Sequence, residues 1–149
     1  MNNFIDYISF EVIIHTTEDE NKVKKALYFL LNNINIDIKD EIIEGYYGNI
    51  MKIIKCKILK KKNCYDFLYF LKKNLILEEK RKLISKIRSR IDPNLNLYIR
   101  VNKQKSFIRE IKLSEENYED SIIIKIKLRT YPKSYLKACE IMEEFFEQF

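Results

Sequence analysis

Cationic side chains occupy the outward positions of three predicted strands, a pattern typical of a surface that binds phosphates. The outward positions are Lys55 and Lys57 in the first of these strands, Tyr98 and Arg100 in the second, and Lys125, Lys127 and Arg129 in the third. Phosphates favour such cations, and an exposed tyrosine such as Tyr98 can stack on a base with about 1–3 kcal/mol. If the three strands share one sheet, its open face is predicted to bind nucleic acid. The alternative is a solvated sheet face, on which lysines also block pairing with the edges of other sheets.

Further basic residues are concentrated in the middle of the chain. Residues 51–110 hold 18 Lys or Arg against 5 Asp or Glu, a net charge of +13, whereas the whole 149-residue chain carries +6. The clusters are Lys60, Lys61 and Lys62; Lys80, Arg81, Lys82, Lys86, Arg88 and Arg90; and Lys103, Lys105 and Arg109. This uneven distribution favours a polyanionic partner. Each cluster alone is also typical of an ordinary solvated surface, and none distinguishes RNA from DNA or from an acidic protein.

The residues that could support catalysis are few and isolated. His15 is the one histidine, and no nucleophile or carboxylate can be placed beside it. The acidic run Glu18-Asp19-Glu20 is better explained as the first turn of a helix than as a metal site. The cysteines, Cys56, Cys64 and Cys139, lack CxxC spacing, which argues against a disulfide framework and against structural zinc. We therefore expect no cofactor, no metal and no enzymatic activity.

The elements that position these residues are predicted from hydrophobic periodicity. Residues 7–15 alternate as a half-buried strand, and a helix is expected over 18–32, with Thr17 capping the N–H of Glu20. Residues 36–44 and 50–59 predict a hairpin, and its loop holds the only glycines of the chain, Gly45 and Gly48. Glycine is needed where φ is positive or where another backbone comes close.

The second half of the chain continues with helices and strands in alternation. Helices are predicted at 64–74 and 77–91 (or one helix with a break near Asn74), strands at 95–101, 108–113 and 121–130, an irregular or short helical turn at 102–106, and a closing helix from Pro132 through Phe149. The order is βαββααβββα. Because the strands alternate instead of forming solid apolar runs, the fold class is α+β, an antiparallel sheet with helices packed mainly on one face.

Length and hydropathy set the remaining expectations. At 149 residues, a single domain over 1–149 is expected, large enough to bury a core without a disulfide or a metal. The N-terminal residues do not form a signal peptide, because Asp6 and Glu11 interrupt their apolar residues. A run of about 18 apolar residues is missing, so we expect no membrane contact and a cytoplasmic protein.

Three blocks of residues carry a resemblance to a known family. They are His15-Thr16-Thr17-Glu18-Asp19-Glu20 with Val23, Ala26 and Leu27; Glu44-Gly45-Tyr46-Tyr47-Gly48-Asn49; and Leu97-Tyr98-Ile99-Arg100-Val101-Asn102-Lys103-Gln104, preceded by Arg90 and Asp92. In this order, over about residues 4–149, they resemble the archaeal RNA-binding protein family that is also labelled a predicted exosome subunit. Two positions depart from the family: Asn102 stands where an aspartate is usual, and Ile50 stands where a proline is common.

The resemblance implies a fold similar to that of the ribosomal protein that holds 5S RNA in the large subunit. It also implies an archaeal cytoplasmic protein with RNA as its partner, and with exosome or ribosomal proteins as further partners. The residues that it singles out are His15, Gly45, Tyr46, Tyr47, Gly48 and Asn49, together with Arg100, Lys103 and Gln104. The glycine loop is either a structural turn or a site where N–H groups and tyrosines meet a phosphate and a base.

The function predicted from these features is non-catalytic RNA binding in RNA processing, decay or ribosome assembly. The predicted RNA contacts are Lys55, Lys57, Lys60, Lys61, Lys62, Tyr98, Arg100, Lys103, Gln104, Lys105, Lys125, Lys127 and Arg129. One alternative is a protein-interaction module, or a structural partner of an RNP complex, without direct RNA contact. It would dock a partner or a second copy through Met142, Phe145, Phe146 and Phe149 of the closing helix, although the role favoured for this stripe is to close the core. Another is an unrecognised enzyme such as a nuclease, which would need clustered carboxylates or an activated nucleophile.

Overall fold

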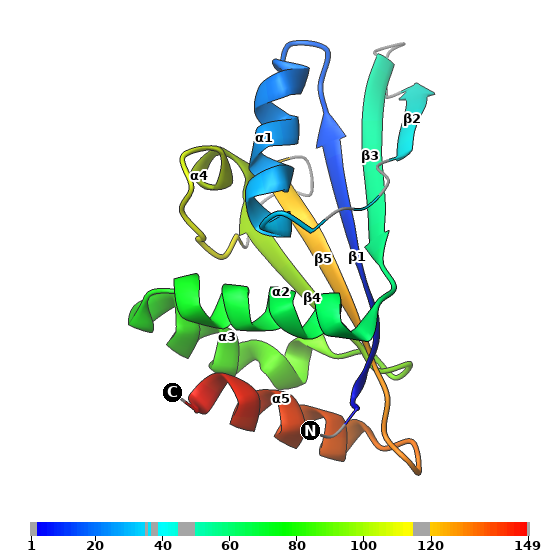
Figure 1. Cartoon of the computed structure of the whole chain (residues 1–149), viewed down its shortest axis with the longest axis vertical. Coiled ribbons are helices and arrows are strands. Elements are labelled where there is room, and N and C mark those ends of the chain that lie inside the picture. The colour runs from blue at the N-terminus through cyan, green and yellow to red at the C-terminus, as the bar shows by residue number, and fades with distance from the viewer. Residues whose placement is uncertain (1–2, 35, 37–38, 45–49, 115–119, 149) are drawn as a thin grey trace.

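The computed structural model describes residues 3–34, 36, 39–44, 50–114 and 120–148, which form an antiparallel sheet with helices on one side (Figure 1). The strands are β1 (Ile5–Ile14), β2 (Lys39–Glu44), β3 (Ile50–Ile58), β4 (Asn96–Asn102) and β5 (Ser121–Leu128); the helices are α1 (Glu20–Leu31), α2 (Lys61–Asn74), α3 (Leu77–Arg90), α4 (Lys103–Phe107) and α5 (Tyr135–Glu147). The strand order is β2-β3-β1-β5-β4, so the first and the last strand of the chain meet in the middle. The predicted fold class is confirmed.

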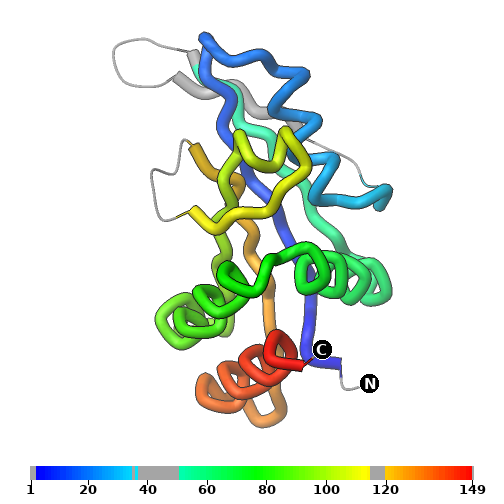
Figure 2. The backbone as a smooth tube through the Cα atoms, turned by 90° about the vertical axis from the view of Figure 1, so that its left-hand side faces the viewer, coloured from blue at the N-terminus to red at the C-terminus, as the bar shows by residue number. Residues whose placement is uncertain are grey.

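The helices cover the sheet at two levels. Figure 1 and the side view in Figure 2 show α1 along the upper part of the strands, whereas α2, α3 and α5 lie across the lower part, near both chain ends. α2 and α3 are separate helices, because the backbone is extended at Leu75 and Ile76. In the part of the chain that is described, no helix combines the length and the apolar character needed to cross a membrane.

Alternation along the strands builds the core and leaves the other face of the sheet open. In β4, Leu97, Ile99 and Val101 are buried, and the residues between them are only half-buried. Phe10 of β1 meets Phe67 of α2 edge-on, with ring centroids 5.0 Å apart. Burying side chains of this size stabilises the fold by about 1.5–3 kcal/mol each, so the pattern fixes which face of each strand remains open.

A β-bulge at Asp6 adjusts this alternation in β1. Ile5 pairs with Leu128 and Tyr7 pairs with Lys127, so β1 contains one more residue than β5 at this point. Lys61, at the start of α2, donates to the backbone carbonyl of Asp6 and lies 3.1 Å from its carboxylate. The bulge keeps Ile5 in the core and places Tyr7 on the open face. The predicted strand was counted from residue 7, beyond the bulge. β1 instead begins at Ile5, because the bulge brings Ile5 back into the alternation.

Two helix starts differ from the prediction. Asp19, and not Thr17, caps α1: its carboxylate accepts a hydrogen bond from the Asn21 N–H at 2.9 Å. An aspartate caps as well as a threonine and adds a negative charge at the positive end of the helix. α2 begins at Lys61 with Lys60 as its cap residue, so the three lysines 60–62 open a helix instead of closing a strand.

The segment after β4 is not the strand that was predicted over 108–113. The chain leaves β4 through α4 and turns back at Arg109, where φ is 67°. Within the described residues, only a short return segment, residues 112–114, comes back to the edge of β4. There the Asn102 N–H donates to the Lys112 carbonyl and the Ser114 N–H donates to the Arg100 carbonyl, each at 2.8 Å. One isolated bridge satisfies these backbone groups without a longer strand.

The closing helix α5 packs onto the lower end of the core. Met142 and Phe146 are fully buried, and Phe145 is partly buried against Phe4 and Tyr69. Phe149 lies outside the described residues. Of the two roles open to this apolar stripe, the favoured one, closing the core, is confirmed for Met142 and Phe146, and these two side chains are not available to dock a partner.

Candidate nucleic-acid interface

The open face of the sheet brings together cations from strands that lie far apart in the sequence. The register aligns Lys57, Ser9, Lys125 and Tyr98 in one row across β3, β1, β5 and β4. The adjacent row holds Lys55, Glu11, Ile123 and Arg100 in the same strand order. Because neighbouring strands lie about 4.8 Å apart, each row spans roughly 14 Å. The condition set by the sequence, that these strands share a sheet, is met.

A hollow of about 890 Å³ runs over these rows, and we call it the sheet-face groove. Its lining residues include Ser9, Glu11, Lys55, Lys57, Leu59, Lys60, Tyr98, Ile123 and Lys125. Glu11 is the one carboxylate among the described residues that line it, and Lys55 lies 3.8 Å away. An ion pair that is this exposed contributes little, so the groove keeps an excess of positive charge.

Tyr7 lies between the lysines at the centre of the open face. The Lys57 and Lys125 ammonium groups lie 4.4 Å and 5.4 Å from the centroid of its ring. Cation–π contacts of this kind attract the ammonium groups to the ring of Tyr7 and so help to position the two lysine side chains. Tyr7 was not among the predicted contacts, although its outward parity with Ser9 and Glu11 in the first strand was a signal for it.

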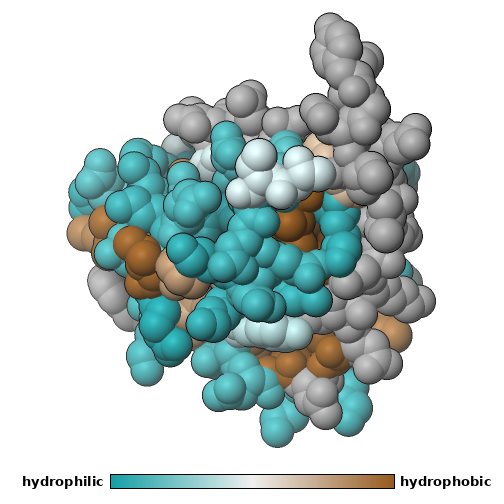
Figure 3. All heavy atoms as spheres, turned by 90° about the horizontal axis from the view of Figure 1, so that it is seen from above, coloured by the Kyte–Doolittle hydropathy of each residue, from teal (hydrophilic) through white to brown (hydrophobic). Residues whose placement is uncertain are grey.

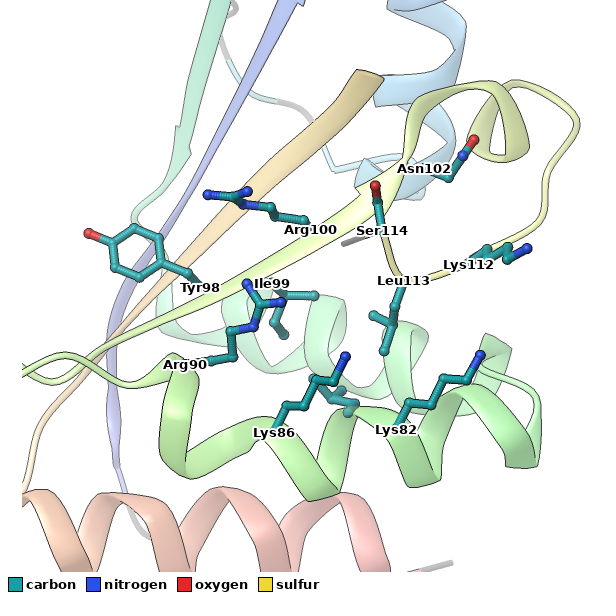
Figure 4. A pocket seen from close by; sticks show the side chains of 11 residues that line it. Lys82, Lys86, Arg90, Tyr98, Ile99, Arg100, Asn102, Lys112, Leu113 and Ser114 are labelled. Carbon is teal, nitrogen blue, oxygen red and sulfur yellow. The ribbon is translucent and has the colours of Figure 1, made fainter. Parts of the chain in front are cut away.

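A second hollow, of about 350 Å³, lies at the outer edge of β4 (Figure 4). We call it the β4-edge pocket; α3 supplies Lys82, Leu83, Lys86 and Arg90, β4 supplies Tyr98, Ile99, Arg100 and Asn102, and the return segment supplies Lys112, Leu113 and Ser114. Tyr98 lines both the pocket and the sheet-face groove, so the two hollows adjoin. The basic residues of α3 and Lys112 were not among the predicted contacts, because their convergence on Arg100 depends on how α3 packs.

Lys103 is buried, and its prediction as an RNA contact is wrong. Its side chain is 2% exposed. Its ammonium group donates to the Ile13 carbonyl and to the Glu18 carboxylate, both at 2.9 Å. A charge in such a position must be paired, and here the pair joins β1 and the loop after it to α4. We call this arrangement the Lys103 clamp.

Residues of the first and third sequence blocks form hydrogen bonds in and beside the Lys103 clamp. Glu18 of the clamp also accepts a hydrogen bond from the His15 N–H at 3.0 Å, which closes the turn before α1. Asn102 caps α4 by accepting from the Lys105 N–H at 2.9 Å. Asparagine and aspartate cap helices equally well, so the departure from the family at Asn102 leaves this role intact. The second block, from Gly45 to Asn49, lies outside the described residues.

The other predicted contacts lie around the groove or apart from it. Lys62 is exposed on α2. Lys127 and Arg129 follow Lys125 at alternate positions along the chain. Lys127 donates to the Asn94 carbonyl, and Arg129 lies 5.9 Å from the ring centroid of Tyr131. Gln104 and Lys105 belong to α4, which packs against α1 on the helical side. Lys61 holds the bulge at Asp6, so its charge is used within the fold.

The described residues offer no metal-binding cluster, and their cysteines are buried. They contain no group of three or more His, Cys, Asp or Glu that could hold a metal ion. Cys56 is the cysteine nearest the groove, and burial raises the pKa of its thiol to about 12. Because the thiolate is the nucleophilic form, Cys56 stays unreactive at neutral pH. Burial also raises the pKa of the Cys64 thiol.

The surface at the upper end of the molecule is mainly hydrophilic. In the view from above in Figure 3, the described side chains are mostly polar, and hydrophobic ones show in separate patches. Contiguous apolar patches mark many protein interfaces, whereas binding of a polyanion needs charge more than apolar area. Among the described side chains visible in this view, the hydrophobic ones form no single continuous patch.

Comparison with known proteins finds related sequences and structures over most of the chain. A family model described as RNA binding matches residues 7–128. A Pyrococcus abyssi protein named as an RNA-binding protein is 33% identical over 144 residues, covering 94% of this chain and 92% of its own length. A solved DUF54 structure from Archaeoglobus fulgidus has a TM-score of 0.84 at 30% identity, covering 95% of this chain and 99% of that one. A DUF54 protein from Methanothermobacter thermautotrophicus has a TM-score of 0.81 at 26% identity, with coverages of 96% and 98%.

Proposed function

We propose that the open face of the sheet binds RNA and that the protein does so without catalysis. The premise is that the chain belongs to the RNA-binding family, whose model matches residues 7–128. The observation that carries this proposal is the row formed by Lys57, Ser9, Lys125 and Tyr98. Four strands hold these side chains in fixed register on one accessible face. Such a row offers cations for phosphates and an aromatic ring for a base within one short span.

Single-stranded RNA suits this surface better than a duplex. In an RNA helix the bases are stacked on one another, so a tyrosine ring cannot reach their faces. An unpaired base can lie on Tyr98, while the lysines of β3 and β5 contact the adjoining phosphates. Phosphate contacts are indifferent to sequence, so binding should depend strongly on salt and weakly on base identity.

The cellular setting that we propose is the archaeal cytoplasm, because the named relatives come from archaea. There the protein would act in RNA processing, decay or ribosome assembly, beside exosome or ribosomal proteins. The likeness to the 5S-RNA-binding ribosomal protein stays a prediction from the sequence.

The test removes both lysines that flank Tyr7. We expect Lys57→Ala with Lys125→Ala to weaken binding of a single-stranded oligonucleotide. The dependence of log K on log[salt] should also become shallower, by about 0.7 for each phosphate contact that is lost. Fluorescence anisotropy at several salt concentrations measures both quantities, and circular dichroism verifies that the variant is folded.

The matched control is Lys25→Ala with Lys133→Ala, which removes the same charge from exposed positions outside both hollows. This variant should bind RNA with an affinity and a salt slope close to those of the unmodified protein. If the control and the Lys57/Lys125 variant lose the same affinity, binding follows net charge alone and the open face is not the site. Unchanged binding by the Lys57/Lys125 variant leads to the same conclusion.

A further inference from the structure

We infer that the β4-edge pocket holds successive phosphates of the RNA strand whose bases lie on the sheet-face groove. This inference rests on the proposed function and adds to it a path for the strand. The RNA would cross the open face, pass Tyr98, and turn round the edge of β4 toward α3. The two hollows share Tyr98, which makes such a path continuous.

The first argument is the spacing of cations on α3. Lys82, Lys86 and Arg90 follow one another at intervals of four residues, so they lie on one face of the helix. Figure 4 shows their side chains rising from α3 toward β4. Like charges at this spacing repel one another and weaken a helix. A bound anion along the stripe would turn this repulsion into attraction.

The second argument is that this charge is only partly neutralised by the protein. Arg90, Arg100 and Lys112 form no salt bridge with any described residue. Lys82 has acidic neighbours, Glu78 at 3.9 Å and Glu79 at 3.7 Å. The Glu79 carboxylate is buried between Lys82 and the return segment, so it neutralises part of the charge of Lys82. The pocket therefore presents three cations that no described carboxylate neutralises, one each from α3, β4 and the return segment: Arg90, Arg100 and Lys112.

The third argument is that the fold holds the pocket open. One isolated bridge pairs Ile91 with Leu97 and another pairs Val101 with Leu113, so no described strand lies alongside β4 at Ile99, between them. The buried Glu79 carboxylate accepts a hydrogen bond from the Leu113 N–H at 3.3 Å, which ties the return segment to α3. The walls are thus fixed by the backbone before any ligand arrives, which lowers the entropy lost on binding.

The length of the stripe distinguishes a passing strand from a single terminal phosphate. The eight-residue step from Lys82 to Arg90 corresponds to about 12 Å of helix. That length exceeds one phosphate group and matches several consecutive groups of an extended strand. Arginine and lysine are both suited to phosphate oxygens, arginine through its planar fork and lysine as a point charge.

The test compares a long and a short oligonucleotide. We expect Arg90→Ala with Lys112→Ala to weaken binding of a strand of about twelve nucleotides roughly tenfold, and to lower its salt slope by about 0.7 per lost phosphate. A strand of about four nucleotides, which fills only the sheet-face groove, should bind this variant as tightly as the unmodified protein. Arg81→Ala with Lys133→Ala is the matched control, because Arg81 lies on α3 but does not line the pocket.

The outcomes separate this inference from the proposed function. If the Arg90/Lys112 variant binds the long strand normally while the Lys57/Lys125 variant does not, the pocket inference fails and the proposed function stands. If the Lys57/Lys125 variant binds both strands normally, the proposed function itself fails. Equal losses with the short and the long strand would also overturn the inference, because the pocket would then not be reached by extension of the strand.

A last comparison uses long strands with and without a terminal phosphate. Passage through the pocket predicts that the Arg90/Lys112 variant loses affinity equally for strands ending in hydroxyl or in phosphate. A loss confined to strands with a terminal phosphate would mean that the strand ends in the pocket, and it would overturn the inferred path.

Discussion

The open face of the sheet and the Lys103 clamp are both rich in charge, and they use it in opposite ways. Lys57 and Lys125 project from the sheet into solvent, where they flank Tyr7 and leave their charge available. Lys103 follows β4 directly, but its ammonium group is enclosed and bonded to a carbonyl and a carboxylate. The sequence places Lys103 in the same block as Tyr98, yet one residue faces a ligand surface and the other supports the fold.

The difference teaches that a lysine's role follows from the face on which its backbone places it. An exposed lysine keeps its hydration and can exchange counterions for RNA phosphates. A buried lysine must satisfy its charge within the protein, because an unpaired buried charge is very costly. Each of the following predictions changes one side of this comparison.

The largest expected effect concerns β3, where Cys56 stands between Lys55 and Lys57 and faces the opposite side. Because burial raises the Cys56 pKa from 9.0 to about 12, its thiolate population near pH 8 should be about a thousandfold below that of an ordinary thiol. We expect the unmodified protein to resist a thiol reagent and Lys57→Cys to gain one rapidly labelled thiol, as counted by mass spectrometry. Rapid labelling of Cys56 in the unmodified protein, distinguished from Cys64 and Cys139 by peptide mapping, would contradict the assignment of faces in β3.

The next largest effect concerns the stability of the Lys103 clamp. Lys103→Met should lower the free energy of unfolding by about 3 kcal/mol, because it removes the cation that pairs with the Glu18 carboxylate and donates to the Ile13 carbonyl. Lys105→Ala is the control, since its 3.8 Å pair with Glu110 is exposed and should contribute less than about 1 kcal/mol. Urea denaturation measures both, and equal midpoints for the two variants would show that the clamp is not structural.

A smaller effect is expected on the open face. Tyr98→Ala should weaken RNA binding by about 1–3 kcal/mol, and Tyr98→Phe should retain most of the affinity, because stacking depends on the ring and not on the hydroxyl. Titration of a fluorescent single-stranded oligonucleotide measures the three affinities. If the phenylalanine variant is as weak as the alanine variant, the tyrosine acts through its hydroxyl and base stacking is excluded.

The smallest effect is an increase in affinity. Glu11→Gln removes the carboxylate from the groove and should strengthen RNA binding severalfold at low salt, an advantage that high salt should abolish. Glu144→Gln, on the exposed side of α5, removes the same charge elsewhere and should change the affinity little. Equal gains in the two variants would show that the RNA responds to net charge and not to the groove.

Much of this surface could be predicted from the sequence because strand alternation is a local property. The parity of Lys55, Lys57, Lys125 and Tyr98 followed from the apolar residues between them, and the sheet places all four on one face. The prediction failed for Lys103, since the residue lies just beyond β4, where α4 begins and alternation no longer applies. The basic stripe on α3 was visible as a spacing, but its position beside β4 was not.

The sequence alone determined which side chains of each strand face outward and that the middle of the chain carries the positive charge. Both are consequences of local periodicity and of composition. The tertiary structure alone decided that β1 and β5 pair at the centre, that Lys103 finds Glu18 across 85 residues of chain, and that α3 lies against β4. These contacts form because the strands and helices must share one buried core, and that packing, unlike periodicity, depends on the whole chain at once.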